Sequence, residues 1–309
     1  MKTYGRREFL KLSAAAAAGF GLAFRSHRDL LFDISLAEWS LNKAIFSGKL
    51  DHLEFAAFTR KQGIGAVEYV NQYFKDKAGD TAYLAEMKKR ADDVDVLSLT
   101  IMCDSEGAIG HPEEKERLQA VDNHKKWVEA ANYLGCHSIR VNGYHPGVED
   151  YDEAMKLVSD GLRRLSEFAD DQDVNVLIEN HGGLSSNGKW LAGVMKMADH
   201  PRAGTMPDFG NFRLNRESSY DSYRGVAELM PYAKAVSVKP TVWDDEGNQH
   251  PLDYVRMTKI VLDAGYRGYF GIEHGREGEE AESIQEVKLG LEAARRELEG
   301  EYKWHIRSE

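Results

Sequence analysis

Residues 174–183 read VNVLIENHGG, and the interpretation of the fold begins from this stretch. A run of apolar, strand-forming residues ends directly in Glu179, Asn180 and His181, and two glycines then break the chain. A carboxylate and an imidazole are costly to bury without partners, so one such stretch is explained equally well by an ordinary polar turn. The choice between an ordinary polar turn and a functional strand end depends on whether other predicted strands end in the same way.

The same unit recurs along the chain: a short apolar run, a polar or glycine-containing break, and an amphipathic helical stretch. The strands are expected at residues 32–40, 64–70, 95–102, 137–142, 174–180, 203–210, 235–240 and 269–275. The helices are expected at residues 52–63, 81–94, 114–135, 151–171, 188–200, 220–233, 252–266 and 282–300. Strands that alternate with helices predict a parallel sheet with right-handed crossovers, and eight units fit a single closed (β/α)8 TIM barrel. A doubly wound open sheet is the alternative, but no G-x-G-x-x-G follows the first strand.

The first 30 residues differ from this pattern. Arg6 and Arg7 are followed by Phe-Leu-Lys and then by a small, weakly apolar run, which resembles a twin-arginine export signal. The run covers roughly 13 residues and is too short to cross a bilayer; an N-terminal amphipathic helix is the alternative. We therefore expect residues 1–30 to be a signal for the twin-arginine translocation machinery with a short linker. Residues 31–309 would form the barrel, periplasmic or otherwise exported and not attached to a membrane.

Composition and cysteine content exclude some partners and bonds. The chain of 309 residues has a formal net charge of −11 and a pI of about 5.5. This charge disfavours nucleic acid as a partner, since binding a phosphate backbone needs a basic surface. Cys103 and Cys136 are expected at opposite ends of neighbouring strands, roughly 16 Å apart. They should be free thiols, because a disulfide needs Cα atoms within about 7 Å.

The strand ends carry the chemistry, because active sites of such barrels lie at the C-terminal ends of the strands. Acidic residues end three of the expected strands: Glu179, Asp208 and Glu273. Three carboxylates at the same end of neighbouring strands repel one another unless a positive charge lies between them. One divalent metal ion is the predicted solution, and oxygen ligands with at most one imidazole suit Mn, Mg, Co or Zn. Lys239, at the end of the seventh strand, is the alternative source of positive charge.

The motifs LIENHGG, MPDFGNF, VSVKP and GIEHG resemble the sugar phosphate isomerase/epimerase family, the xylose isomerase-like barrels. The resemblance extends from about Phe32 to the last helix. It implies that Glu179, Asp208 and Glu273 bind the cation, together with a seventh-strand residue that is often His. That position is Ser237 here, which weakens the fourth ligand. His181, which alternation places on the same side as Glu179, is the candidate substitute, with substrate contact as the alternative.

The resemblance also implies a reaction. A metal-dependent sugar isomerase or epimerase removes a proton next to a carbonyl and stabilises the resulting enediolate. Glu179 and Glu273 would transfer the proton. Lys239 would be an electrophile or a second base with a lowered pKa, or else would form a salt bridge to Asp208 or Glu273. The candidate substrate-binding residues are Glu68, Arg140, Asn142, His145, Trp39 and Trp243, and indole faces suit the C–H faces of sugars.

Three other functions are compatible with such a barrel. A lyase that cleaves oxidised (3-keto) glycosides by β-elimination shares the first proton abstraction and has a similar IENHGGLSS motif. A non-catalytic sugar-binding protein and an abasic-site endonuclease are the remaining alternatives, and the negative charge disfavours the nuclease. The expected partner is a small carbohydrate, and an exported protein favours a free sugar, a sugar acid or an oxidised glycoside over a sugar phosphate.

Overall fold

The computed structural model describes residues 30–306, with side chains as far as Tyr302. The chain divides between Leu30 and Leu31, so the barrel is described by itself. The predicted export signal, with Arg6 and Arg7, lies outside the described residues.

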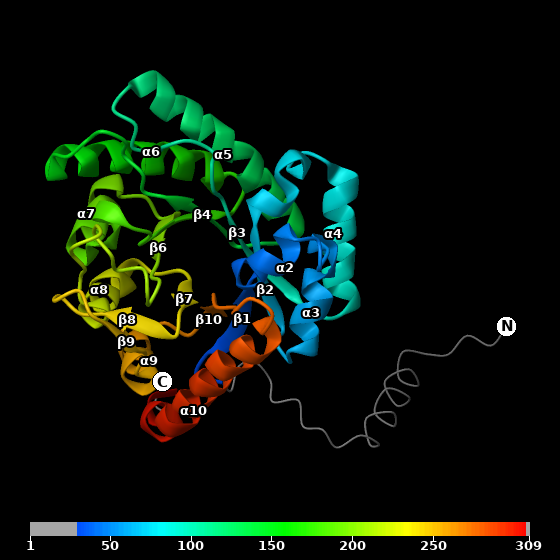
Figure 1. The fold of residues 1–309 in the computed structure, drawn as a ribbon. Coiled ribbons are helices and arrows are strands. Elements are labelled where there is room, and N and C mark those ends of the chain that lie inside the picture. Colours follow the sequence, from blue (N-terminus) through cyan, green and yellow to red (C-terminus); the bar gives the residue numbers. More distant parts are fainter. Residues whose placement is uncertain (1–29, 307–309) are drawn as a thin grey trace, which may run out of the picture. The chain divides into compact units, whose positions relative to one another are not determined.

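Eight parallel strands form the wall of a nearly closed barrel (Figure 1). They are β1 (Asp33–Ala37), β2 (Ala66–Val70), β3 (Leu97–Met102), β4 (Ser138–Asn142), β5 (Asn175–Glu179), β6 (Ala203–Met206), β7 (Val236–Val238) and β10 (Tyr269–Ile272). Their hydrogen-bonded order is β6-β5-β4-β3-β2-β1-β10-β7. Isolated parallel bridges join Thr205 to Ala233 and Asp208 to Ser237, and these bring β7 against β6. The TIM-barrel prediction is confirmed, and every strand lies within its predicted range.

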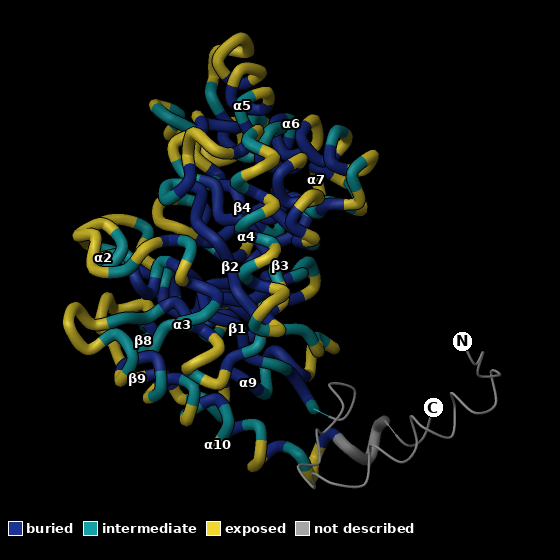
Figure 2. Tube along the Cα trace, turned by 90° about the vertical axis from the view of Figure 1, so that its right-hand side faces the viewer, coloured by how far each residue is buried: buried dark blue, intermediate teal, exposed yellow. Residues whose placement is uncertain are grey.

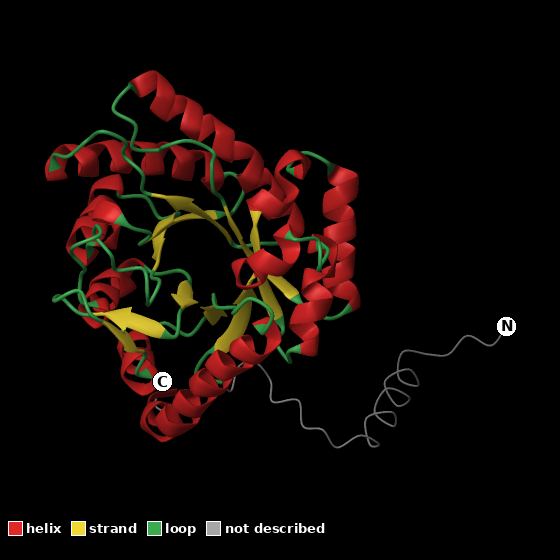
Figure 3. Cartoon of the chain, in the orientation of Figure 1, coloured by secondary structure: helices red, strands yellow, loops and turns green. Residues whose placement is uncertain are grey.

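Helices surround the ring of strands (Figure 3). The α-helices are α2 (Asn42–Phe46), α3 (Phe55–Lys61), α4 (Thr81–Asp93), α5 (Glu114–Leu134), α6 (Tyr151–Asp170), α7 (Gly188–Ala198), α8 (Ser222–Leu229), α9 (Tyr254–Asp263) and α10 (Glu280–Ile306). Short 3₁₀ helices are η2 (Glu38–Leu41), η3 (His52–Glu54), η4 (Asn71–Lys77), η5 (Gly183–Ser186) and η6 (Met230–Tyr232). Each predicted helical range overlaps one α-helix. The predicted glycine end of α5 is present, since Gly135 has a φ of 81° that other residues adopt at a cost.

Alternation along the strands sends side chains into two cores, and buried residues fill the centre of the barrel (Figure 2). Outward-facing side chains pack under the helices in one large apolar cluster. The inward-facing cluster comprises Ala37, Val70, Met102, Leu177, Met206 and Ala235. Glu68, Arg140 and Glu179 are also buried. Because apolar side chains surround them, charges in the barrel act on one another more strongly than they would in water.

One supersecondary element was not predicted. β8 (Thr241–Trp243) and β9 (Gln249–Pro251) form an antiparallel hairpin after β7. Its turn is held by Asp244, whose Oδ1 accepts a hydrogen bond from the backbone N–H of Asn248 at 2.7 Å. Two three-residue strands, one of them fully exposed, are too short to show an apolar alternation.

The cysteine prediction is confirmed, since Cys103 and Cys136 are both free and buried. Among residues 30–306, no helix has the length and apolar character that a membrane span requires.

Candidate active site

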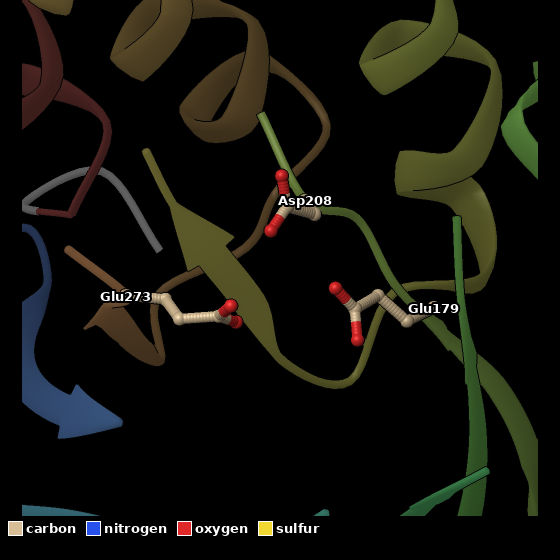
Figure 4. A group of neighbouring side chains, drawn as sticks. All are labelled: Glu179, Asp208 and Glu273. Atoms are coloured by element: carbon tan, nitrogen blue, oxygen red, sulfur yellow. The ribbon is translucent and has the colours of Figure 1, made fainter. Parts of the chain in front are cut away.

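Three carboxylates meet at the C-terminal mouth of the barrel (Figure 4). Glu179 is the last residue of β5, Asp208 follows β6, and Glu273 follows β10. One ligand oxygen from each lies within 4.8 Å of the other two, and all three residues are buried. In the part of the chain whose side chains are described, this is the one group of three or more residues that could hold a metal ion.

Asp208 is fixed by the backbone around it and by Asn180. Its Oδ1 accepts hydrogen bonds from the backbone N–H groups of Gly210 (2.7 Å) and Asn211 (2.8 Å). Asn180 Oδ1 accepts from the Asp208 N–H at 2.7 Å, and Asn180 Nδ2 donates to the Asp208 carbonyl at 2.9 Å. The polar end of VNVLIENHGG therefore has two functions: Glu179 enters the cluster, and Asn180 holds the end of the neighbouring strand. Asp208 Oδ2 remains directed at the cluster.

Two seventh-strand residues face these carboxylates, as alternation predicts. Ser237 Oγ lies 3.0 Å from Asp208 Oδ2 and 3.2 Å from Glu273 Oε2, and its single proton can be donated to either. Lys239 Nζ lies 2.5 Å from Asp208 Oδ2 and 2.8 Å from Glu273 Oε1. The salt-bridge alternative for Lys239 is therefore the one that the structure shows.

The lowered pKa predicted for Lys239 is wrong for this arrangement. Burial by itself lowers the pKa of the ammonium, but the charges of the neighbouring carboxylates outweigh burial and raise the pKa above its usual value. Lys239 is therefore a fixed positive charge and a hydrogen-bond donor, and it is not suited to accept a proton.

Glu179 lies between an amide and a buried guanidinium. Asn211 Nδ2 donates to Glu179 Oε1 at 3.0 Å, and Arg140 Nε lies 2.9 Å from Oε2 without the alignment of a hydrogen bond. Burial raises the pKa of Glu179, and the Arg140 charge opposes this rise.

Arg140 Nη1 and Asn142 Nδ2 both donate to Asp104 Oδ1, at 2.7 and 2.8 Å. Burial alone would raise the pKa of Asp104, but Arg140 and the hydrogen bonds lower it to about 2.

The residues of the cluster fit a divalent cation. All three carboxylates present oxygen, the ligand type of hard divalent ions, and Ser237 adds a neutral oxygen beside them. Glu179 Oε2 is buried and has no hydrogen-bond donor, so this oxygen has capacity for another ligand. Lys239 contacts one oxygen each of Asp208 and Glu273, so a cation would compete with it for these atoms.

The structure does not place His181 among the three clustered carboxylates, so its role as a metal ligand stays a prediction. β5 ends at Glu179, and His181 belongs to the exposed turn that begins η5. Once the strand has ended, alternation no longer fixes the direction of a side chain. The imidazole is close enough to lower the pKa of Glu179, but it lines the cavities above the cluster.

Two cavities lie beside the cluster and share His181 and Gly182. The larger has a volume of about 750 Å³ and is lined by Ser105, Gly107, Ala108, His111, Asn142, Gly143, Tyr144, His145, Pro146, His181, Gly182, Gly183 and Ser185. The smaller has a volume of about 360 Å³ and is lined by His181, Gly182, Gly210, Asn211, Arg213, Lys239, Thr241, Trp243 and Gln249. Lys239 connects the smaller cavity directly to the carboxylates. Of the predicted substrate-binding residues, Asn142, His145 and Trp243 line a cavity.

The other predicted substrate-binding residues lie outside both cavities. Arg140 and Glu68 are buried within the barrel wall and line neither cavity. β2 continues two residues beyond Glu68, so this carboxyl lies deeper than a strand end. Trp39 follows β1 and packs on Tyr73, with ring centroids 6.5 Å apart.

Glu68 is an unusual buried acid. Ser35 Oγ donates to its Oε1 at 2.7 Å, while its Oε2 is buried without a hydrogen-bond partner. Burial raises the pKa of Glu68 to about 7. Gly271 on β10 makes room for it, since a Cβ there would lie 2.4 Å from Glu68 Oε1.

Three polar residues near the candidate site were not predicted from the sequence. Asp104 holds Arg140 and Asn142, Asn211 holds Glu179, and Tyr73 has a buried hydroxyl without a hydrogen-bond partner. Asp104 comes shortly after β3, so the strand-end rule could have identified it. Asn211 and Tyr73 lie on loop and 3₁₀ segments, whose direction no periodicity predicts.

Comparison with known proteins agrees with the fold. A family model described as a xylose isomerase-like TIM barrel matches residues 56–296. No curated protein sequence gives a significant match.

Solved structures of the same fold include carbohydrate epimerases. The apo structure of 3-keto-D-glucoside 4-epimerase YcjR from E. coli has a TM-score of 0.60 at 16% identity, covering 85% of this chain and 99% of its own. A structure of L-ribulose 3-epimerase has a TM-score of 0.66 at 15% identity, covering 87% and 97%. A xylose isomerase-like TIM barrel protein from Mycobacterium smegmatis, in complex with magnesium, has a TM-score of 0.64 at 15% identity, covering 87% and 99%.

Proposed function

The chain belongs to the xylose isomerase-like TIM barrel family, and on this premise we propose that it is a divalent-metal-dependent sugar isomerase or epimerase. The observation that carries the proposal is the convergence of Glu179, Asp208 and Glu273 at the mouth of the barrel. Carbohydrate epimerases among the solved structures of the same fold support it.

Glu179, Asp208 and Glu273 would hold the cation, with Ser237 or a substrate oxygen completing the set. When bound, a divalent cation polarises a carbonyl and stabilises the negative charge that develops on its oxygen as a neighbouring proton leaves. Mn, Mg, Co and Zn all suit the donor set. The magnesium complex of the Mycobacterium smegmatis protein, which has the same fold, supports a cation of this kind.

Proton transfer is assigned to Glu179 and Glu273. The two side chains point toward a common centre from opposite sides (Figure 4). A carbon held between them would lose its proton to one carboxylate and could regain a proton from the other. The new proton would then arrive on the opposite face of the carbon, which is what epimerisation requires.

Lys239 is assigned a role as a hydrogen-bond donor and a fixed positive charge. Its position in the smaller cavity and its contacts with Asp208 and Glu273 place a permanent positive charge beside the reacting centre. A positive charge there would stabilise an oxygen that becomes negative, and this electrostatic contribution needs no change in the lysine's own protonation.

A lyase that acts on oxidised glycosides is the second candidate. Proton abstraction next to a ring ketone would be followed by departure of the aglycone from the β carbon, so the same carboxylates would serve. The cavity of about 750 Å³ favours this candidate, because it offers room for a group attached to the sugar. One solved structure of the same fold is a 3-keto-D-glucoside 4-epimerase.

The test combines metal analysis with proton exchange. Purified protein should contain, or be activated by, Mn, Co, Zn or Mg, and NMR in deuterated water should show deuterium entering a candidate ketose next to its carbonyl. Glu273→Gln should lower exchange by about 10²-fold or more, whereas Glu279→Gln on the exposed surface should leave it unchanged.

Other outcomes point to other functions. Release of an aglycone from an oxidised glycoside would identify the lyase. Failure of every metal to support exchange with any candidate sugar would leave a non-catalytic sugar-binding protein, and cleavage of abasic DNA would identify a nuclease.

A further inference from the structure

The larger cavity has a lining that the reaction at the carboxylates does not explain. Glycines 107, 143, 182 and 183 and Pro146 supply backbone and small surfaces, and Tyr144 and three imidazoles supply planar rings. We propose that this cavity is a binding subsite for a planar, uncharged aromatic aglycone, so that the substrate is an aryl glycoside whose sugar carries a ring carbonyl and lies at the carboxylate cluster. This inference rests on the proposed function and narrows its substrate class.

The shape of the lining favours a flat group. A Cβ built on Gly182 or Gly183 would meet no atom within 4 Å, so the backbone there faces open space. Both glycines have positive φ, 89° and 61°, so most other residues would be strained at these positions. A ring can lie directly against such a peptide surface. Tyr144, with 63% of its surface exposed, provides an aromatic face in the same lining.

The imidazoles have complementary hydrogen-bonding states. The backbone N–H of Glu113 donates to His111 Nδ1 at 3.1 Å, so the proton of the neutral ring lies on Nε2, which is a donor. His145 Nδ1 lies 3.1 Å from the carbonyl oxygen of Val148 and must donate to it, so Nε2 of this ring is an acceptor. One donor and one acceptor at the cavity suit a free phenolic hydroxyl on the aglycone, which accepts one hydrogen bond and donates another, whereas the glycosidic ether oxygen can only accept.

The absence of charge in the larger cavity excludes other groups. None of its lining residues is Lys, Arg, Asp or Glu, so a phosphate or carboxylate would have no ionic partner there. The smaller cavity differs, because Arg213 and Lys239 line it. An anionic or strongly polar substituent would therefore enter the smaller cavity and an uncharged group the larger one.

The larger cavity is connected to the reacting centre. His181 and Gly182 line both cavities, and Lys239 lies in the smaller one. Asn142 lines the larger cavity and donates to Asp104, which holds Arg140 beside Glu179. A single molecule can therefore extend from the carboxylates over His181 into the larger cavity.

The test is a comparison of binding constants, since unoxidised glycosides have no ring carbonyl and serve as unreactive probes. Isothermal titration calorimetry with phenyl and methyl β-D-glucopyranosides, and with the matching galactosides in case the sugar differs, gives the contribution of the aryl group. We expect the phenyl glycoside to bind about tenfold more tightly than the methyl glycoside. His111→Ala and Tyr144→Ala should each remove most of this difference and leave methyl glycoside binding unchanged. Tyr133→Ala, which removes a half-exposed tyrosine of α5 outside both cavities, should alter neither.

Several outcomes would overturn the inference. The aryl subsite would be disproved by equal affinity for phenyl and methyl glycosides or by no binding of either. It would also be disproved if the variants lost affinity for both glycosides equally. Binding of cellobiose as tight as that of the phenyl glucoside would assign the cavity to a second sugar. Binding does not depend on turnover, so failure of deuterium exchange with an intact phenyl preference would overturn only the proposed reaction.

Discussion

At the scale of single residues, Lys239 and Ser237 face the three carboxylates from the seventh strand and its end. The ammonium of Lys239 contacts the oxygens of Asp208 and Glu273 that a cation would need. Lys239→Met removes this competing charge, so the affinity for Mn²⁺ should rise on the order of tenfold, measured by calorimetry. The same change should lower the exchange rate, because the donor is lost. Lys196→Met, on the exposed surface of α7, is the control, and an unchanged or lower affinity in Lys239→Met would contradict the assigned competition.

Glu68 should make stability depend on pH. Burial raises its pKa from 4.5 to about 7, so the folded chain holds a proton that the unfolded chain has released. This stabilisation is complete below about pH 4.5 and is lost as the pH rises through about 7. Glu68→Gln should therefore match the parent chain at pH 5 and exceed it by up to about 3 kcal/mol at pH 8, measured by urea unfolding. Glu149→Gln, at an exposed carboxylate, should show no such difference, and parallel pH profiles for both variants would disprove the expectation.

The convergence of the three carboxylates could be predicted and the protonation state of Lys239 could not. Glu179, Asp208 and Glu273 each end a predicted strand, so chain position alone brings them to one edge of the barrel. The pKa of Lys239 depends on how close carboxylates from other strands approach, and no periodicity within its own strand encodes that distance. His181 lies beyond the end of β5, where alternation stops.

At the scale of elements, β10 and β2 are fitted to one another through Gly271. A Cβ on Gly271 would lie 2.4 Å from Glu68 Oε1, so Gly271→Ala must displace the carboxyl and should cost about 1–3 kcal/mol of stability. Combining it with Glu68→Ala should relieve much of this cost, a coupling that thermal or urea unfolding of the double-mutant cycle measures.

Gly300→Ala is the matched control for this substitution. Gly300 lies on α10, and a Cβ there would meet nothing within 4 Å, so alanine should stabilise the chain by up to about 1 kcal/mol. If Gly271→Ala were equally harmless, Glu68 would not fill the space between β2 and β10.

The barrel strands and their helices were predictable because each carries its own periodicity. The hairpin of β8 and β9 was not, since its exposed strands have no apolar face to mark them. This hairpin places Thr241, Trp243 and Gln249 in the smaller cavity, so a segment without a clear pattern contributes to the candidate site.

At the scale of the whole molecule, export remains a prediction from Arg6 and Arg7. We expect that changing both to lysine retains the protein in the cytoplasm, because the twin-arginine machinery requires the paired guanidinium groups. Cell fractionation with immunodetection measures the distribution. Arg25→Lys with Arg28→Lys is the control, and export of the Arg6, Arg7 variant at the parental level would rule out this route.

The sequence by itself determined the barrel and the edge at which its chemistry lies, because hydrophobic periodicity and strand ends are local properties of the chain. Only the tertiary structure decided which side chains meet: Lys239 with Asp208 and Glu273, Arg140 with Glu179, and His181 with the cavities in place of the cluster. These distances depend on the stagger of strands from distant parts of the chain and on the packing between them. Charge and shape at the mouth are therefore properties of the closed ring, which no single stretch of residues specifies.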